Sequence, residues 1–201
     1  MVKNLFNKPV FDQFPELETA RLRLVEIKPD HAPDIYAHFS NEAVTRYLDL
    51  NCMVEPEEAE RLIDFLAKRF TQERGLRWGV QPKGEEQIIG TCGFNIWSKG
   101  KFQAELGYDL SPAHWRQGLM TEAVAAVLDF GFSRMELHKI EALVWPANTP
   151  SETFLKQLGF QWQGMVREFR ASTGRQAAMH LFEMVKVQWL WRQPARVDFR
   201  F

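Results

Sequence analysis

The chain has 201 residues, of which 45% are hydrophobic and 25% are charged, and its formal net charge is −1. These values predict one globular domain with a sizeable core, and they exclude a strong electrostatic attraction to nucleic acid or to anionic lipid. Cys52 and Cys92 are too few and too far apart for a disulfide framework or a metal knuckle, so they indicate a reducing, cytoplasmic setting.

The first third of the chain predicts one strand followed by helices. Residues 21–27 alternate between apolar and polar side chains, as a half-buried strand does. Asp30 is the expected N-cap of a short helix over 28–39, and a second short helix is expected over 41–49. Residues 55–70 have acidic residues at their start and basic residues at their end, which is typical of a helix whose charges complement its dipole.

The middle and the end of the chain predict six more strands and two helices. Three strands joined by short turns are expected to form an antiparallel meander over 76–82, 88–97 and 102–110. A long helix with its apolar face running from Thr121 to Phe132 follows, and then a strand over 138–145. A helix over 148–160 with Gly159 as C-cap precedes a hairpin whose strands are expected over 161–170 and 177–190.

This order of elements is mixed α+β rather than a strict βαβα alternation. The strand–helix–strand unit in the middle predicts that 102–110 and 138–145 are parallel neighbours with the long helix crossing over. We expect a single domain over 1–201, with an N-terminal extension over 1–16 and a C-terminal tail over 190–201. No apolar run approaches the length of a membrane span, so no membrane partner is expected.

The segment SPAHWRQGLMTEA, residues 111–123, connects a strand to the start of the long helix. The first N–H groups of a helix have no internal partner, and the helix dipole adds partial positive charge there. Gly118 has no Cβ, so an anion can approach the backbone, while Arg116 and Gln117 add donors. The segment therefore indicates a phosphate or pyrophosphate site, although an ordinary strand-to-helix turn is an equal alternative.

Taken together, several blocks of the sequence resemble the GNAT superfamily of N-acetyltransferases. Within it, the chain is most similar to the RimJ/RimL-like branch, which acetylates protein N-termini, ribosomal proteins among them. The blocks that carry the resemblance are LETARLRL (17–24), IIGTCGF (88–94), AELGYDL (104–110), WRQGLMTEA (115–123) and the long segment 137–168. The resemblance implies the GNAT acyl-CoA N-acyltransferase fold: a mixed, mostly antiparallel sheet of about seven strands with a central parallel pair and helices on both faces.

The resemblance also implies the ligand and the site. Acetyl-CoA is the implied co-substrate, with its pantetheine between the strands at 104–110 and 138–145 and an N–H near Leu106 facing the thioester oxygen. Glu105 is the implied general base, and Ser151 is the implied donor of a proton to the leaving thiolate. The implied cofactor-binding residues are Leu106, Tyr108, Trp115, Arg116, Gln117, Gly118, Leu119, Met120, Thr121, Glu122 and Asn148.

Each assignment has a plainer alternative. Glu105 is also compatible with a salt-bridged surface residue, Ser151 with a serine that bonds the backbone, Asn148 with a helix N-cap and Tyr108 with simple packing. His114 and His138 are more typical of capping or solvated histidines than of proton shuttles. The five histidines lack any metal-ligand spacing, so no metal is expected.

The expected activity is acetyl transfer from acetyl-CoA to a primary amine, with a protein N-terminal α-amine as the favoured acceptor. The alternatives are a polyamine or aminoglycoside acetyltransferase and a non-catalytic acyl-CoA-binding module. Trp115 and Met120 depart from the family's usual loop residues, and the hairpin lacks the acidic residue that the family often carries at position 178, here Ala178. The tail over 190–201 interleaves arginines with aromatic residues, a pattern compatible with single-stranded nucleic acid. The net charge near zero favours packing or a homodimer contact instead.

Overall fold

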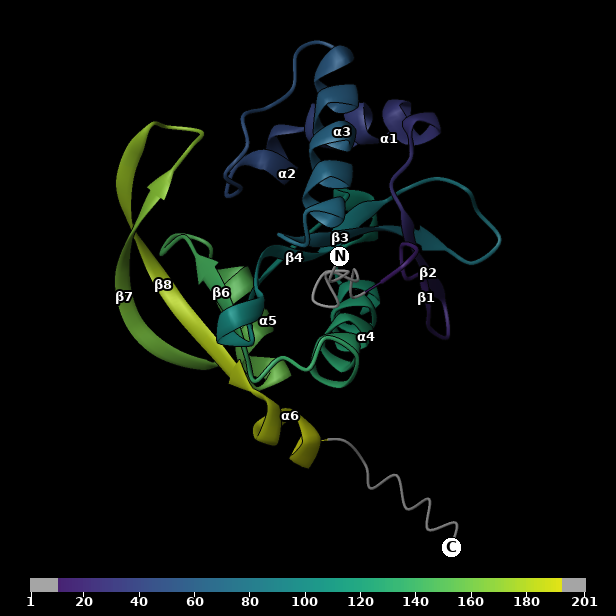
Figure 1. Cartoon of the computed structure of the whole chain (residues 1–201). Coiled ribbons are helices and arrows are strands. Elements are labelled where there is room, and N and C mark those ends of the chain that lie inside the picture. Colours follow the sequence, from purple (N-terminus) through teal and green to yellow (C-terminus); the bar gives the residue numbers. More distant parts are fainter. Residues whose placement is uncertain (1–10, 193–201) are drawn as a thin grey trace, which may run out of the picture.

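The computed structural model describes residues 11–192, and these form one eight-stranded sheet in the order β1-β2-β3-β4-β5-β6-β8-β7 (Figure 1). The strands are Leu17–Glu18 (β1), Leu22–Glu26 (β2), Leu76–Pro82 (β3), Gly90–Ser98 (β4), Gln103–Leu110 (β5), Lys139–Val144 (β6), Gln161–Arg170 (β7) and Arg175–Val185 (β8). The helices are Ala32–Phe39 (α1), Glu42–Thr45 (α2), Glu57–Thr71 (α3), Leu119–Ser133 (α4), Thr149–Leu158 (α5) and Lys186–Arg192 (α6).

The sheet has the topology that the sequence predicts. β3, β4 and β5 form the antiparallel meander, and β5 and β6 are a parallel pair joined by the crossover helix α4. The other neighbouring strands are antiparallel. The sheet exceeds the expected seven strands by one, because the two-residue strand β1 pairs with β2.

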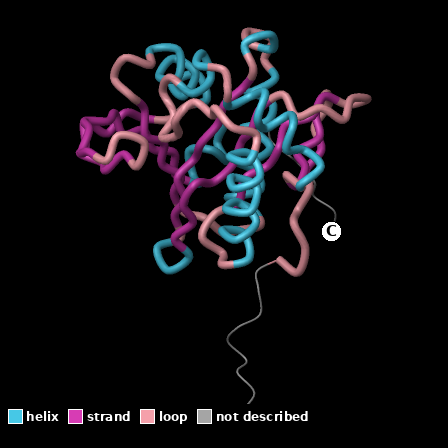
Figure 2. The backbone as a smooth tube through the Cα atoms, turned by 90° about the horizontal axis from the view of Figure 1, so that it is seen from above, coloured by secondary structure: helices cyan, strands magenta, loops and turns pink. Residues whose placement is uncertain are grey.

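Helices cover both faces of the sheet, as expected. Figure 1 shows α1, α2 and α3 on one side and α4 and α5 on the other. The larger core lies on the α4 side, where Trp78 and Phe94 of the sheet pack in one cluster with Val124 and Leu128 of α4. Seen from above in Figure 2, the β7–β8 hairpin extends to the side of the helical body.

Two sequence expectations differ from the structure near element ends. Asp30 lies inside the 3-10 turn Pro29–His31, and the α1 N-cap is His31, so Asp30 does not cap α1. The helix expected over 41–49 is limited to Glu42–Thr45, with Asn41 as its cap. These shifts are typical of helix ends, where capping geometry rather than periodicity sets the first and last residues.

The strand expected over 177–190 is wrong in its last part. β8 ends at Val185, and residues 186–192 turn into α6. A long-range contact explains this turn, since the buried Trp189 donates its indole N–H to Asp129 Oδ1 on α4 at 2.7 Å. Residues 1–10 of the expected N-terminal extension and residues 193–201 of the expected tail lie outside the described part of the structure.

Within residues 11–192, no helix combines the length and the apolar character that crossing a bilayer would require.

Candidate active site

The parallel pair β5–β6 opens at the centre of the sheet. Only three residue pairs connect the two strands: Gln103–Lys139, Ala104–Ile140 and Glu105–Glu141. Beyond Glu105, β5 continues to pair with β4 as far as Leu110, and β6 continues to pair with β8 as far as Val144. The facing backbone edges of Leu106–Leu110 and Ala142–Val144 therefore lack a strand partner, so an extended ligand could form backbone hydrogen bonds there.

The predicted anion loop lies at the N-terminus of α4. Arg116 and Gly118 both have left-handed backbone angles, with φ of 60° and 75°, and Gly118 is the N-cap. The first intrahelical bond is from Glu122 N–H to Gly118 C=O at 3.1 Å, so the N–H groups of Leu119, Met120 and Thr121 have no partner within the helix. Residues 115–118 are exposed, which leaves this end of α4 open to an anionic ligand.

Two polar side chains of the loop are engaged within the protein. Trp115 donates its indole N–H to Leu110 C=O at 2.6 Å, which holds the loop against the end of β5. Gln117 donates its amide to Ala113 C=O at 3.0 Å, so in this arrangement it stiffens the loop. The backbone N–H groups and the exposed Arg116 therefore remain as the donors that the loop presents.

Glu122 connects α4 to the turn between β1 and β2. Its carboxylate accepts hydrogen bonds from Thr19 Oγ1 at 2.5 Å, from Arg21 N at 2.7 Å and from Arg21 Nε at 2.7 Å. Burial opposes ionisation of Glu122, but the bonds from Thr19 and Arg21 outweigh it and lower the pKa of its carboxyl. Glu122 therefore holds another element in place and is not a free group in the loop.

Arg21 lies in the turn between β1 and β2 and contacts the anion loop, a position that the sequence did not predict. Its Nη1 donates to Gln117 C=O at 3.0 Å, and a Cβ on Gly118 would lie 3.5 Å from its Nη2. The half-exposed guanidinium thus adds a positive charge beside the open N–H groups of α4. No local signal could have identified it, because Arg21 lies 101 residues from Glu122 in the sequence.

Tyr108 and Ser151 form a hydroxyl pair on the α5 side of the opening. The Tyr108 hydroxyl lies 2.7 Å from Ser151 Oγ, and the Tyr108 ring packs against Phe154 at 4.8 Å between centroids. Burial raises the pKa of the Tyr108 hydroxyl, so the pair stays protonated at neutral pH. Ser151 therefore uses its hydroxyl toward Tyr108 rather than toward the backbone.

Asn148 is the N-cap of α5, which was the expected alternative to a role in binding the cofactor. Its side-chain oxygen accepts a hydrogen bond from Ser151 N–H at 3.3 Å. This bond fixes the first turn of α5 and with it the position of the Ser151 hydroxyl.

Glu105 projects to the opposite face of β5, toward α1 and α3, because side chains alternate along a strand. It is the last β5 residue that pairs with β6, so its carboxylate lies where the two strands begin to separate. Asn95, the bulged residue of β4, donates its amide to Glu105 Oε1 at 3.2 Å. Burial raises the pKa of Glu105, and the negative charges of Glu168 and Glu141 add to this, while Asn95 and Arg170 oppose it.

A network of polar groups holds Asn95, the hydrogen-bond donor to Glu105. Arg77 donates to the Asn95 side-chain oxygen, to Thr91 Oγ1 at 2.7 Å and to Asp109 Oδ2 at 2.5 Å. Asp109 Oδ1 in turn lies 2.7 Å from His38 Nε2 of α1. Burial alone would raise the pKa of Asp109, but the charge of Arg77 and the bonds from His38 and Thr91 lower it to about 2. This ionised network fixes the side chain that holds Glu105.

Neither candidate proton shuttle, His138 or His114, hydrogen-bonds to Glu105, whose side-chain partner is Asn95. His138, the exposed residue directly before β6, stacks on Phe102, the residue directly before β5, with 4.7 Å between the ring centroids. His114 belongs to the 3-10 turn Pro112–His114 ahead of the anion loop, and its Nδ1 is buried without a hydrogen-bond partner. Among residues 11–192, no group of three or more His, Cys, Asp or Glu side chains is arranged to hold a metal ion.

These parts make a consistent reaction site. A carboxylate whose pKa is raised lies on one face of β5, and a protonated hydroxyl pair lies on the other. The opening between β5 and β6 separates them, and the anion loop begins five residues beyond the end of β5. Such an arrangement can remove a proton on one side, supply a proton on the other and hold an extended, phosphorylated ligand between them.

Comparisons with known proteins agree with this arrangement. Residues 21–161 match the family described as Acetyltransferase (GNAT) domain. The chain is 37% identical over 173 residues to the N-acetyltransferase YoaA of Bacillus subtilis, covering 86% of this chain and 98% of that protein. It is 30% identical over 99 residues to the [Ribosomal protein uS5]-alanine N-acetyltransferase of Escherichia coli, covering 49% of this chain and 51% of that protein.

Solved structures share the fold at low sequence identity. The acetyltransferase from Salmonella typhimurium that modifies the N-terminal serine of ribosomal protein L7/L12 superposes with a TM-score of 0.74 at 15% identity, covering 83% of this chain and 96% of that one. The microcin C7 self-immunity acetyltransferase MccE, in complex with acetyl-CoA and AMP, superposes with a TM-score of 0.72 at 15% identity, covering 83% and 93%.

Proposed function

The chain belongs to the GNAT acetyltransferase family, whose members use acetyl-CoA, and from this premise we propose that it acetylates the N-terminal α-amine of a protein or peptide. The main support is the position of Glu105, a half-buried carboxylate at the point where β5 and β6 separate. A general base needs a pKa nearer to the working pH than that of an ordinary carboxylate, and burial of Glu105 shifts its pKa in that direction.

The residues of the opening fit acetyl-CoA. The unpaired N–H groups of Leu119, Met120 and Thr121, with Gly118 ahead of them and Arg21 beside them, match a pyrophosphate group. The backbone edge of β5 from Leu106 onward matches an amide-bearing arm, and Asn148 caps α5, the helix that carries Ser151. Bound acetyl-CoA supplies an activated acetyl group, and the residues of this chain supply binding and proton transfer.

The roles of the side chains follow from their faces. Glu105 accepts a proton from the attacking amine on the α1–α3 side, directly or through one water molecule. The Tyr108–Ser151 hydroxyl pair lies on the α5 side and gives a proton to the departing thiolate through the Ser151 hydroxyl. Asn95 orients the Glu105 carboxylate, so it is a positioning residue rather than a catalytic one.

An α-amine suits this base better than a lysine does. An α-amine has a pKa of about 7.8 and a lysine of about 10.4, so removing the proton from lysine costs roughly 3.5 kcal/mol more. The negative charges of Glu168 and Glu141 also raise the pKa of Glu105. Neither is a second buried base, because Glu141 pairs with Lys139 at 2.6 Å and Glu168 is exposed. Glu105 therefore remains the half-buried proton acceptor, and the smaller cost of deprotonation favours the α-amine as substrate.

A CoA-release assay tests the function. The wild type is expected to release CoA from acetyl-CoA with peptides whose N-terminus is free, and to do so more slowly with polyamines and aminoglycosides. Glu105→Gln should lower kcat about 10²- to 10⁴-fold, while Glu60→Gln, an exposed glutamate on α3, serves as the matched control. A loss below threefold for Glu105→Gln would remove Glu105 from the mechanism.

Mass spectrometry of blocked peptides tests the acceptor. A peptide with a blocked lysine and a free N-terminus should gain one acetyl group, and a peptide with a blocked N-terminus and a free lysine should gain none. Acetylation that survives N-terminal blocking and disappears on lysine blocking would contradict the α-amine assignment.

A further inference from the structure

The face of the sheet that carries the Glu105 side chain also carries an exposed apolar side chain directly beside it. Ile96 of β4 is the residue that pairs with Glu105 in the β4–β5 ladder. The side chains of directly paired residues lie on the same face, with their Cβ atoms about 4.5–5.5 Å apart. Ile96 is nevertheless 47% exposed, so an apolar surface meets solvent next to the proposed base.

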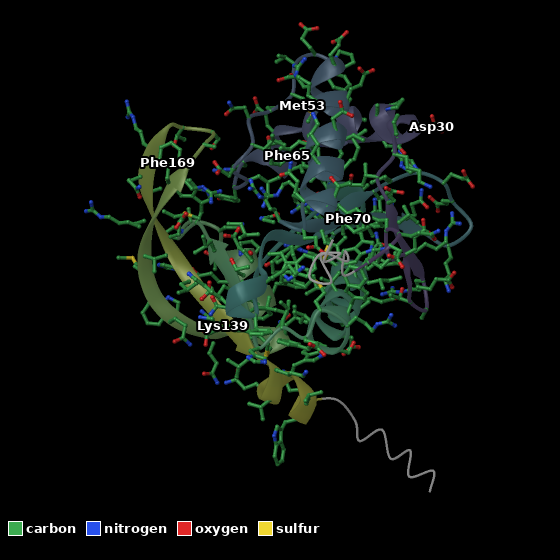
Figure 3. All side chains as sticks on the ribbon, in the orientation of Figure 1. Asp30, Met53, Phe65, Phe70, Lys139 and Phe169 are labelled. Atoms are coloured by element: carbon green, nitrogen blue, oxygen red, sulfur yellow. The ribbon has the colours of Figure 1, made fainter. Side chains whose placement is uncertain are left out.

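Helix α3 adds a second exposed apolar side chain on this face. Arg69 of α3 donates a hydrogen bond to the backbone oxygen of Asn95, and the Asn95 amide donates to Glu105 at 3.2 Å. Phe65 lies one helical turn before Arg69, whose guanidinium carbon is 5.4 Å from the Phe65 ring centroid. Phe65 is 52% exposed, and Figure 3 shows it on α3, above the sheet. Printed contacts thus connect this ring, through Arg69 and Asn95, to the surroundings of Glu105.

The side chains on the β6 side of Glu105 are charged. Its partner on β6 is Glu141, which in turn pairs with Glu183 on β8. Lys139 forms ion pairs with both of these carboxylates, at 2.6 Å and 3.1 Å. Covering this charged row with an apolar group would remove water from it at a cost. An apolar group beside Glu105 is therefore better placed on the β4 and α3 side.

The position of the base limits where the acceptor's first side chain can lie. A general base acts within about 3 Å of the nitrogen that it deprotonates, or through one water molecule. The Cα atom of an N-terminal residue is only about 1.5 Å from that nitrogen. The side chain of the first residue therefore begins among the groups that surround Glu105.

We infer that Phe65 and Ile96 bind the first side chain of the acceptor and select a large apolar residue, such as leucine or methionine. Contact with these half-exposed side chains removes apolar surface from water on both partners, which favours binding. Glycine and serine bring little or no apolar surface, and an acidic first residue is repelled by the neighbouring glutamates. This inference rests on the proposed acetylation of an α-amine and adds which N-terminal residue is preferred.

Peptides that differ only in their first residue test the inference. Four peptides begin with leucine, methionine, glycine or serine, and all have the same remaining sequence with any lysine blocked. The wild type should show a kcat/KM about 5- to 20-fold higher on the leucine and methionine peptides than on the glycine and serine peptides. This range is below that for full burial of such a side chain, because an open surface covers only part of it.

Variants of the two residues connect the preference to this surface. Ile96→Ala and Phe65→Ala should each lower the leucine-to-glycine ratio of kcat/KM about threefold, and the double variant should lower it further. Leu190→Ala, which removes a 56% exposed side chain from α6, is the matched control and should keep the wild-type ratio. Ile96→Val and Phe65→Leu retain more of the apolar surface and should give intermediate ratios, so they decide the question if an alanine variant does not fold.

The outcomes separate this inference from the proposed function. A wild-type ratio below twofold, or a ratio that stays unchanged in both alanine variants, would overturn the role of Phe65 and Ile96 while leaving α-amine acetylation intact. Equal losses on the leucine and glycine peptides would also overturn it, because they indicate a disturbed reaction centre. If the wild type releases no CoA with any peptide, the proposed function itself fails. A ratio that falls in both variants, with normal thermal stabilisation by acetyl-CoA, supports the inference.

Discussion

The substitution Asp109→Asn should strongly destabilise the protein, because Asp109 is the centre of the network behind Glu105. Its carboxylate is 3% exposed and accepts from His38, from Arg77 and from both the backbone N–H and the hydroxyl of Thr91, at 2.5 to 2.9 Å. Asparagine offers one oxygen in place of two and presents N–H donors to partners that are themselves donors. Arg77, only 13% exposed, would then lose the negative charge that compensates it.

The size of the effect follows from this geometry. Removing one partner of a buried ion pair costs about 3–5 kcal/mol, most of it from the uncompensated charge that remains. For a chain of this length such a loss lowers Tm by roughly 6–20 °C. Asp30→Asn, an exposed aspartate in the turn ahead of α1, is the matched control and should change stability by less than about 0.5 kcal/mol.

The pH dependence of stability gives the prediction a second, independent readout. The pKa of Asp109 lies at about 2 in the folded protein against an ordinary value of 3.8. Stability from a depressed carboxyl is fully present above the ordinary value and is lost as pH falls toward the folded value. The wild type should therefore lose about 2 kcal/mol between pH 5 and pH 2 through this group alone, and Asp109→Asn should lack that part of the acid dependence.

Urea unfolding at pH 7 and at several lower pH values measures both quantities. A destabilisation below about 1 kcal/mol at pH 7 would refute the account of a tightly held ion pair. An unchanged acid dependence in Asp109→Asn would show that the loss of stability in acid comes from other carboxylates.

Three further predictions concern the ligand and the proton transfers. Acetyl-CoA at a hundred times Kd is expected to stabilise the wild type by about 2.7 kcal/mol. Gly118→Val should abolish this stabilisation, because a φ of 75° disfavours a branched residue and the valine side chain would cover the loop. An unchanged thermal shift would place the pyrophosphate elsewhere. The pH profile of kcat should show a limb above pH 4.5, the ordinary value of Glu105, since burial raises its pKa, and Glu105→Gln should lack that limb; a limb retained in the variant would belong to another group. Ser151→Ala should lower kcat about 10- to 100-fold with little change in acetyl-CoA affinity. An equal loss of kcat in Tyr108→Phe would show that the tyrosine supplies the proton. An unchanged kcat in Ser151→Ala would exclude the serine as the proton donor.

The sequence by itself determined the fold class and most of the elements of this protein. Alternating and helical periodicities predicted the meander, the crossover helix and the parallel pair, because those patterns act between residues a few positions apart. Gly118 and Gly159 were recognisable for the same reason: each stands at the end of a helix in a left-handed conformation, with φ of 75° and 97°. The same patterns predicted that Glu105 lies on a strand and Ser151 on a helix, as the structure has them.

Only the tertiary structure decided how those residues are supported. Arg21 meets Glu122 across 101 positions, and His38 meets Asp109 across 71, so no local pattern could connect them. The same holds for the end of β8, where the contact between Trp189 and Asp129 favours a helix over the strand that the alternation predicted. Periodicity reports which face of an element is buried, but which polar groups meet inside depends on the packing of the whole chain.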